Sequence, residues 1–177
     1  MDIIIANFFA DIVGRFFLLD LSGIVLAKHL PFLIVLLSLP VFWRGSGKEV
    51  LFKFFFVVSV LILSKGIIAN SIKYFLSRPR PFEVLNFNPL VEVGGSAFPS
   101  GHGAFLFALS FVVYIFYNDL GLSLLGLSLV NGLARMYVGV HWMSDVMGGF
   151  AVAFLSVFLV YFLLEEKVSR VVEGSMG

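Results

Sequence analysis

Apolar residues follow one another in long runs that short polar joints interrupt. Each run approaches the roughly 20 residues that a helix needs to cross a bilayer, or reaches that length with its flanking turn. We therefore predict an all-α protein, a polytopic membrane helical bundle, in which the 177 residues form one membrane-embedded domain. About five predicted transmembrane helices cover Leu30–Trp43, Val50–Ser71, Gly103–Tyr117, Gly121–Val138 and Ser144–Leu164, the first extended backwards by Ser22–His29.

Residues 1–29 differ from these runs because charges interrupt them, and the segment lacks the basic start of a signal peptide. Asp11 and Arg15 lie four positions apart with apolar residues between them. This spacing predicts amphipathic helices that lie at the membrane surface. The alternative is that part of the segment is a true first span whose charges are paired.

One long polar connection, Lys73–Ser100, separates the second run from the third and holds four of the six prolines. It cannot form one continuous helix. Because the spans alternate in direction, this loop and the joint before the fifth span lie on the same side of the membrane. That side collects nearly all the unusual polar residues: Lys73, Arg78, Arg80, His102, Arg135, His141 and Asp145.

The opposite side carries a second group of cations, which sets the predicted orientation. They are Arg44, Lys48, Lys53, Lys167 and Arg170. Cytoplasmic loops are enriched in Lys and Arg, so this side is predicted to be cytoplasmic together with the C-terminus. The polar cluster then faces outward from an inner membrane, toward the periplasm in a two-membrane bacterium.

Composition narrows the classes of protein further. Hydrophobic residues make up 60% of the chain and charged residues 13%, which excludes a large soluble domain, a strand-rich barrel and a disordered regulator. The net charge of +1 gives no reason to expect nucleic acid as a partner. The absence of cysteine excludes disulfides and cysteine metal sites.

The polar cluster has too many cations for its place beside the membrane. Lys73, Arg80 and Arg135 would be costly there without an anion, and a phosphate would balance them. Ser100 is a good N-cap for the third span, and Gly101 lets a ligand approach the backbone. Such a helix start binds anions, although an ordinary capped helix explains the same residues.

His141 and Asp145 lie four positions apart where the fifth span begins. On a helix they share a face, so Asp145 can accept a hydrogen bond from Nδ1 of His141 and leave Nε2 free for phosphorus. An interfacial pair with only a structural role is the alternative. His102 is a suitable proton donor to a leaving oxygen. Together these groups indicate phosphoryl transfer without a metal, since Asp145 is the only acid in the cluster.

Three segments resemble the motifs of the type 2 phosphatidic acid phosphatases. The first is Lys73 to Pro81 (KYFLSRPRP), the second is Pro99 to His102 (PSGH), and the third combines Arg135, His141 and Asp145. All three occur in the family's order. The third motif of that family has serine before its arginine, where this chain has Ala134, so a hydroxyl near the phosphate is missing.

The resemblance implies a role for each matching residue. His141 would attack phosphorus and form a phosphohistidine, Asp145 would orient it, and His102 would protonate the leaving oxygen. The phosphate would be held by Lys73, Arg80, Ser100, Gly101 and Arg135. No cofactor and no metal are implied, and the partners are the bilayer and a phospholipid or glycolipid substrate.

Compact bacterial members of this family act on lipid A 1-phosphate, undecaprenyl diphosphate or phosphatidylglycerophosphate. Lipid A is preferred here, because no outward domain obstructs a large headgroup and Arg78 and Arg80 together suit its extra charge. Transfer of the phosphoryl group to an alcohol uses the same residues and stays open. An anion-binding or transport protein is the rival from another class. Lys65, inside the second span, is read as structural, snorkelling or paired with Asn131.

Overall fold

The structure, a computed structural model, describes residues 1–43 and 45–176, with side chains up to Glu173. Every regular element in these ranges is helical, so the prediction of an all-α protein is confirmed. The elements are α1 (Asp2–Ala10), α2 (Phe17–Lys28), α3 (Leu30–Ser38), the 3₁₀ helix η1 (Leu39–Phe42), α4 (Gly47–Leu61), the π-helix η2 (Ile62–Ala69), α5 (Asn70–Phe75), α6 (Pro81–Leu85), α7 (Gly101–Phe116), α8 (Asn118–Tyr137) and α9 (Met143–Met176).

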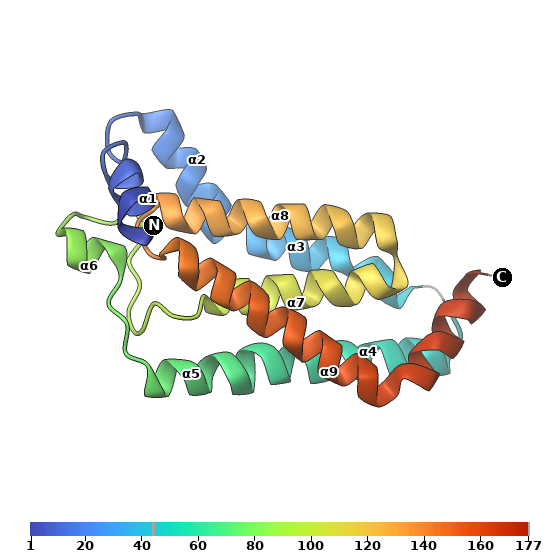
Figure 1. The fold of residues 1–177 in the computed structure, drawn as a ribbon. Helices are drawn as coiled ribbons and strands as arrows, with labels where there is room; N and C mark the ends of the chain where they lie inside the picture. The colour runs from blue at the N-terminus through green and yellow to red at the C-terminus, as the bar shows by residue number, and fades with distance from the viewer. Residues whose placement is uncertain (44, 177) are drawn as a thin grey trace.

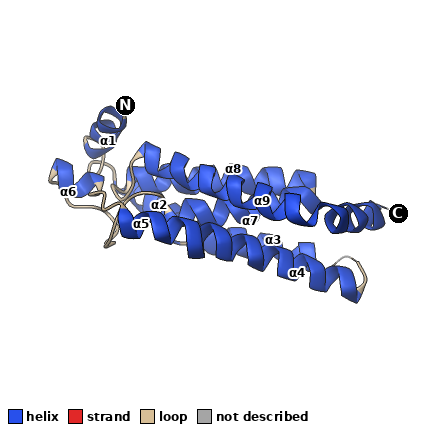
Figure 2. Ribbon diagram, turned by 60° about the horizontal axis from the view of Figure 1, so that its bottom comes forward, coloured by secondary structure: helices blue, strands red, loops and turns tan. Residues whose placement is uncertain are grey.

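The long helices lie side by side and form an elongated bundle (Figures 1 and 2). The segments α4, η2 and α5 make one continuous helix from Gly47 to Phe75, which runs toward the end of the bundle where the N-terminus lies. In the centre, α7 packs against α8 and α9. Its buried residues, among them Leu106, Val112 and Val113, form the middle of the core.

Within the described residues, three helices are long and apolar enough to cross a membrane: Gly47–Phe75, Asn118–Tyr137 and Met143–Glu173. The pair Phe17–Lys28 and Leu30–Phe42 passes the same test together, although its two parts meet at 42°. The apolar helix α7 is shorter than a full span. Each predicted span therefore has a helical counterpart, and most bounds differ by a few residues, but the last helix continues past Leu164 to Glu173.

Close packing of α7 on α9 brings their two N-terminal ends together. A Cβ atom added at Gly149 would lie 2.8 Å from the carbonyl oxygen of Ser100 and 3.0 Å from the amide nitrogen of Ala104. Only glycine leaves room for this crossing. The crossing places Ser100, at the start of α7, next to the first turns of α9.

The N-terminal segment contains helices that point in different directions. Helix α1 lies near α6, at the end of the bundle opposite the C-terminus (Figure 1). Helix α2 packs on α8 and continues into α3 through the bend at His29. The predicted surface position of residues 1–29 is not tested by this arrangement, because the structure contains no membrane.

The long connection is not one helix, which confirms that prediction. Its first residues complete α5, a short α6 follows, and the rest is irregular up to Ser100. The C-terminal ends of α5 and α8, this connection, and the N-terminal ends of α7 and α9 all meet at the same end of the bundle (Figure 1). The parity of the spans predicted this convergence.

Candidate active site

His141 lies in the short joint between α8 and α9 and is almost fully buried. Its Nδ1 atom is 3.4 Å from Oδ2 of Asp145, in the first turn of α9. Among the described side chains this nitrogen makes no hydrogen bond that meets geometric criteria, so the contact is loose. Such contacts are often long in the free enzyme and shorten when substrate is bound.

Asp145 is held from several sides. Its side chain is fully buried. Oδ1 accepts a hydrogen bond of 2.7 Å from Nη1 of Arg78, and Oδ2 accepts one of 2.8 Å from the backbone amide of Trp142. Its carbonyl oxygen also accepts from the amide of Ser100 at 2.9 Å. The second and third predicted motifs are therefore joined directly through Asp145.

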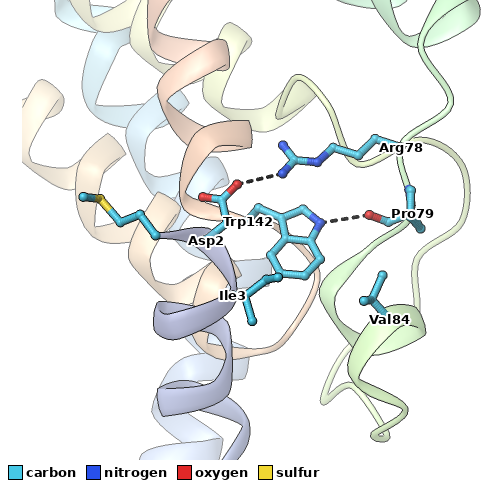
Figure 3. A pocket seen from close by; sticks show the side chains of 7 residues that line it. Asp2, Ile3, Arg78, Pro79, Val84 and Trp142 are labelled. Atoms are coloured by element: carbon cyan, nitrogen blue, oxygen red, sulfur yellow. Dashed lines mark hydrogen bonds and ion pairs between the residues drawn. The ribbon is translucent and has the colours of Figure 1, made fainter.

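Arg78 connects this carboxylate to the N-terminus of the chain, and Figure 3 shows its ion pair with Asp2. Its Nη1 also donates to Oγ of Ser144 at 2.7 Å, and its Nη2 donates to Oδ2 of Asp2 at 2.7 Å. Asp2 in turn accepts hydrogen bonds from the backbone amide and the hydroxyl of Ser144. Two carboxylates, Asp2 and Asp145, thus hold one guanidinium group.

Trp142 forms the other boundary of this network. The Arg78 guanidinium lies over its ring at 5.5 Å, and its indole nitrogen donates to the carbonyl oxygen of Pro79 at 2.9 Å (Figure 3). Burial by itself would raise the pKa of Asp2, but the hydrogen bonds from Ser144 and Arg78 hold that pKa below its ordinary value. Asp2 is therefore an anion at neutral pH and a fixed counter-ion of Arg78.

The start of α7 has the geometry that the sequence predicted. Oγ of Ser100 accepts a hydrogen bond of 3.2 Å from the amide of Gly103, which makes Ser100 the N-cap. Lys73 lies beside this turn, because a Cβ atom added at Gly101 would be 3.8 Å from its Cε atom. The ammonium group of Lys73 donates to the carbonyl oxygen of Ser96 at 2.8 Å.

Arg80 is buried and supports the backbone around the site. Its guanidinium donates to the carbonyl oxygens of Gly94, Gly95 and Val140 at distances between 2.7 and 3.0 Å. An arginine has five N–H donors, so donors remain for an anion after these three bonds. Burial lowers the pKa of Arg80, and the nearby Glu83 opposes the effect.

Arg135 is also buried, but its donors are mostly unused. Its Nε atom has no hydrogen-bond partner among the described residues, and Nη1 reaches only the carbonyl oxygen of Ala27 at 3.4 Å. A buried donor without a partner is unfavourable and indicates a place for a ligand. Arg135 and His102 line the same cavity, of about 750 Å³.

The electrostatic surroundings keep His141 neutral. Burial lowers the pKa of His141 to about 4, the carboxylate of Asp145 opposes this effect, and the charge of Arg135 adds to it. At pH 7 the imidazole is therefore uncharged. A carboxylate next to Nδ1 favours the tautomer with its proton on that atom, and Nε2 then carries the free lone pair.

All predicted site residues thus lie at one end of the bundle, around the starts of α7 and α9. Ala134 does not face the cluster of cations, since it packs with Ala27 and Val138 in an apolar cluster. Of the two alternatives for Lys65, pairing with Asn131 finds no support among the described contacts, where the side-chain amide of Asn131 donates to the carbonyl oxygens of Leu26 and Ala27. Lys65 instead lines the cavity of His102 and Arg135.

Sequence reasoning missed the roles of Arg78 and Asp2. The sequence predicts for Arg78 a contact to the substrate, its headgroup or the surface, yet its guanidinium is occupied by Asp2, Ser144 and Asp145. Its place two residues before Arg80 was the available signal. Nothing in the sequence relates Asp2 to Arg78, because 76 positions separate them.

Comparison with known proteins agrees with this geometry. A sequence model of the PAP2 superfamily matches residues 53–169. The bacitracin transport permease protein BcrC of Bacillus licheniformis is 27% identical over 159 residues, which are 88% of this chain and 76% of that protein. The putative undecaprenyl-diphosphatase YbjG of Escherichia coli (strain K12) is 29% identical over 132 residues, 72% of this chain and 64% of that protein.

The fold also has a relative among solved structures. The crystal structure of the transmembrane PAP2 type phosphatidylglycerolphosphate phosphatase from Bacillus subtilis superposes with a TM-score of 0.67. The superposition covers 93% of this chain and 85% of that chain at 21% identity, which is a likeness of fold. On the match over residues 53–169, the chain belongs to the PAP2 superfamily and is a multi-pass membrane hydrolase that acts on lipid phosphates.

Proposed function

We propose that this protein removes a phosphate group from a membrane lipid through a phosphohistidine on His141, without a metal ion. The observation that carries the proposal is the position of a neutral, buried His141 beside Asp145 in the midst of cations. A neutral imidazole with Nε2 free is a nucleophile at pH 7. The surrounding cations stabilise the negative charge of the phosphoryl group as it is transferred.

Each step of the reaction has a residue to perform it. Nε2 of His141 forms a bond to phosphorus while the bond from phosphorus to the lipid oxygen breaks. Asp145 accepts from Nδ1–H and stabilises the positive charge that the ring acquires. His102 supplies a proton to an alkoxide leaving group and then takes one from the water that hydrolyses the phosphohistidine. Arg80, Arg135, Lys73 and the start of α7 hold the phosphate oxygens.

The division of the site into two sides follows from this chemistry. We call the group around His141, Asp145, Arg78, Trp142 and Asp2 the nucleophile side. The wall of the cavity that contains His102, Arg135 and Lys65 is the leaving-group side. In an in-line displacement the leaving oxygen departs opposite the nucleophile, so the phosphate lies between the two.

The test is phosphate release from purified protein in detergent with excess chelator, compared with His141→Ala. The panel contains lipid A, undecaprenyl diphosphate, phosphatidylglycerophosphate and phosphatidate. Release that survives chelation and disappears in the variant supports the proposal. Release that requires a metal, or that persists in His141→Ala, contradicts it. Uptake into liposomes without phosphate release would support the transport alternative instead.

The structure removes one of the two reasons for predicting lipid A as the substrate. That prediction relied on Arg78 and Arg80 together as binders of a large anionic headgroup, but the guanidinium of Arg78 is already held by Asp2, Ser144 and Asp145. Lipid A 1-phosphate stays in the panel as a prediction. Phosphotransfer is distinguished by the product: added alcohol would become phosphorylated at the expense of inorganic phosphate.

We also propose that the site faces outward and the C-terminus faces the cytoplasm. The site and the C-terminus lie at opposite ends of the bundle (Figure 1). Of the cations used for the orientation, Lys48, Lys167 and Arg170 are exposed, Lys53 is buried among the rings of Phe116 and Tyr117, and Arg44 lies outside the described residues.

The natural absence of cysteine allows a clean test of orientation. Glu92→Cys on the site loop and Lys167→Cys near the C-terminus are labelled in intact cells with a maleimide that cannot cross the inner membrane. Labelling of the first variant alone supports the orientation. Labelling of the second alone reverses it.

A further inference from the structure

The cavity beside His102 carries an unusual set of charges. It has a volume of about 750 Å³, which is within the range of small-molecule sites. Its titratable lining residues are Lys28, His29, Lys65, His102 and Arg135, and none of the described Asp or Glu residues lines it. Most of the remaining lining residues are apolar. Three permanent positive charges therefore share one pocket at the edge of the bundle.

Lys65 is the most exceptional of these cations, because it lies within a helix that spans the membrane. The segment around it, η2, is π-helical, and π-turns occur frequently at functional sites. Oγ of the neighbouring Ser64 donates to the carbonyl oxygen of Ala104 at 2.8 Å. This bond fixes the segment against the first turns of α7, close to His102.

The ammonium group of Lys65 has no anionic partner among the side chains that the structure describes. It lies 5.4 Å from the centre of the Phe105 ring, and no ion pair to a carboxylate forms there. Lys73, Arg78 and Arg80 differ, since each donates to carbonyl or carboxylate oxygens within 3.0 Å. A charge in a membrane span is costly unless it is paired or marks a site.

The direction of the reaction indicates what this cavity receives. His102 lines the cavity and His141 does not. The group that departs from phosphorus opposite His141 therefore enters the cavity. An alcohol leaves as a neutral molecule after protonation and has no need of several cations. A second phosphate group leaves, or accompanies the leaving oxygen, as an anion.

We propose that Lys65, assisted by Lys28, binds a second phosphate group on the leaving-group side, so that the enzyme prefers lipids with two phosphates in the headgroup. This inference rests on the proposed function. In a lipid diphosphate, the bond from Nε2 of His141 to the terminal phosphorus forms as the bond to the bridging oxygen breaks. The electron pair goes to that oxygen, and the lipid monophosphate leaves as an anion paired with Lys65.

Two substrate pairs test the proposal in detergent. The first pair is farnesyl diphosphate and farnesyl monophosphate, whose two phosphates are directly bonded in the former. The second pair is phosphatidylglycerophosphate and phosphatidate, where a glycerol separates the two phosphates. The quantity measured is the ratio of kcat/KM within each pair. Loss of a charged hydrogen bond predicts that Lys65→Met lowers this ratio about 10- to 100-fold, and that Lys65→Arg largely restores it.

Lys48→Met is the matched control, since Lys48 is an exposed lysine near the start of the same long helix and does not line the cavity. It should leave both ratios as in the unaltered protein. If Lys65→Met lowers the kcat/KM ratio of only one substrate pair, the result still supports a site for a second phosphate. It also identifies the spacing between the two phosphates that the site accepts. If Lys65→Met changes kcat/KM by the same factor for the two members of each pair, the proposal is overturned. If the unaltered protein hydrolyses none of these lipids, the proposed function fails as well.

Discussion

The two sides of the site are organised in opposite ways. On the nucleophile side, hydrogen bonds and ion pairs of 2.7 to 2.9 Å join Arg78 to Asp145 and Asp2, and join Trp142 to Asp145 and to the carbonyl oxygen of Pro79. On the leaving-group side, within the described part of the chain, the Nε atom of Arg135 has no hydrogen-bond partner and Lys65 lies over an aromatic ring without an anionic partner. The groups that support the nucleophile are in place before the substrate arrives, although the contact of 3.4 Å from Nδ1 of His141 to Asp145 still has to shorten. The leaving-group side becomes complete when an anion is bound.

This difference separates two physical tasks. A nucleophile must be oriented and kept neutral beforehand, and a network with few free donors does this with little reorganisation. A site for an anionic group needs donors that nothing else occupies. Substitutions on the nucleophile side should therefore slow the chemical step for every lipid, whereas substitutions on the leaving-group side should change which lipids react.

The largest expected effect of changing a supporting residue comes from Asp145→Asn. An amide beside Nδ1 removes the negative charge and favours the wrong tautomer of His141, so kcat should fall about 10³- to 10⁴-fold for all lipids. Single-turnover kinetics on two lipids with different headgroups measure this. A loss confined to one lipid would place Asp145 on the side that selects substrates.

His102→Gln tests the leaving-group side. Removal of a general acid costs about 10²- to 10⁴-fold, and the loss should be greatest when the leaving group is an alcohol. A phosphate leaving group needs little protonation, because its second pKa is about 6, so lipid diphosphates should lose less. The two losses of kcat/KM are compared directly. Equal losses would assign His102 a role other than proton donation.

Arg78→Ala should lower kcat about 10- to 100-fold with little change in KM. The variant removes the arginine that forms an ion pair with the buried carboxylate of Asp145, and breaking a charge-assisted bond has this magnitude. Arg78→Lys keeps the positive charge but lacks the planar guanidinium that can donate to two partners at once, so it should recover part of the loss in kcat. An increase in KM alone would mean that Arg78 binds the headgroup.

The pKa of His141 provides a direct test in which the expected effect is smaller. The chain has three histidines, so ¹⁵N-histidine NMR of His29→Gln, His102→Gln protein in detergent reports His141 alone. We expect titration near pH 4. Because the folded pKa lies below the ordinary value, the unfolded chain binds the proton first, and stability is lost as pH falls below about 6.5 toward 4. Titration near 6.5 would contradict the burial argument.

Asp2→Asn should have the smallest effect, only a few-fold on kcat. The ion pair of Asp2 with Arg78 is partly exposed, and such pairs contribute little. Asp145 and Ser144 still hold the guanidinium in this variant. The control is Asp11→Asn, on an exposed residue of the same N-terminal segment. A loss as large as that of Arg78→Ala would show that Asp2 is the principal anchor of Arg78.

The fold and the proposed catalytic groups were predictable because their signals are local. Runs of apolar residues specify spans, and parity alone places His102, His141 and Lys73 on one side. The Asp2–Arg78 contact was not predictable, since it depends on how α1 docks on α9. The position of Lys65 was also hidden, because a π-turn alters the direction of the side chains and periodicity does not reveal it.

The central claim is a covalent phosphoryl group on His141, and rapid quenching tests it most directly. Lipid labelled with ³²P in the cleaved phosphate is mixed with enzyme in excess chelator, quenched in alkali, where phosphohistidine is stable, and digested. We predict label on the one peptide that contains His141, formed at a rate that supports turnover and absent in His141→Ala. Label on a peptide with His102, or full turnover with no labelled histidine, would contradict the account.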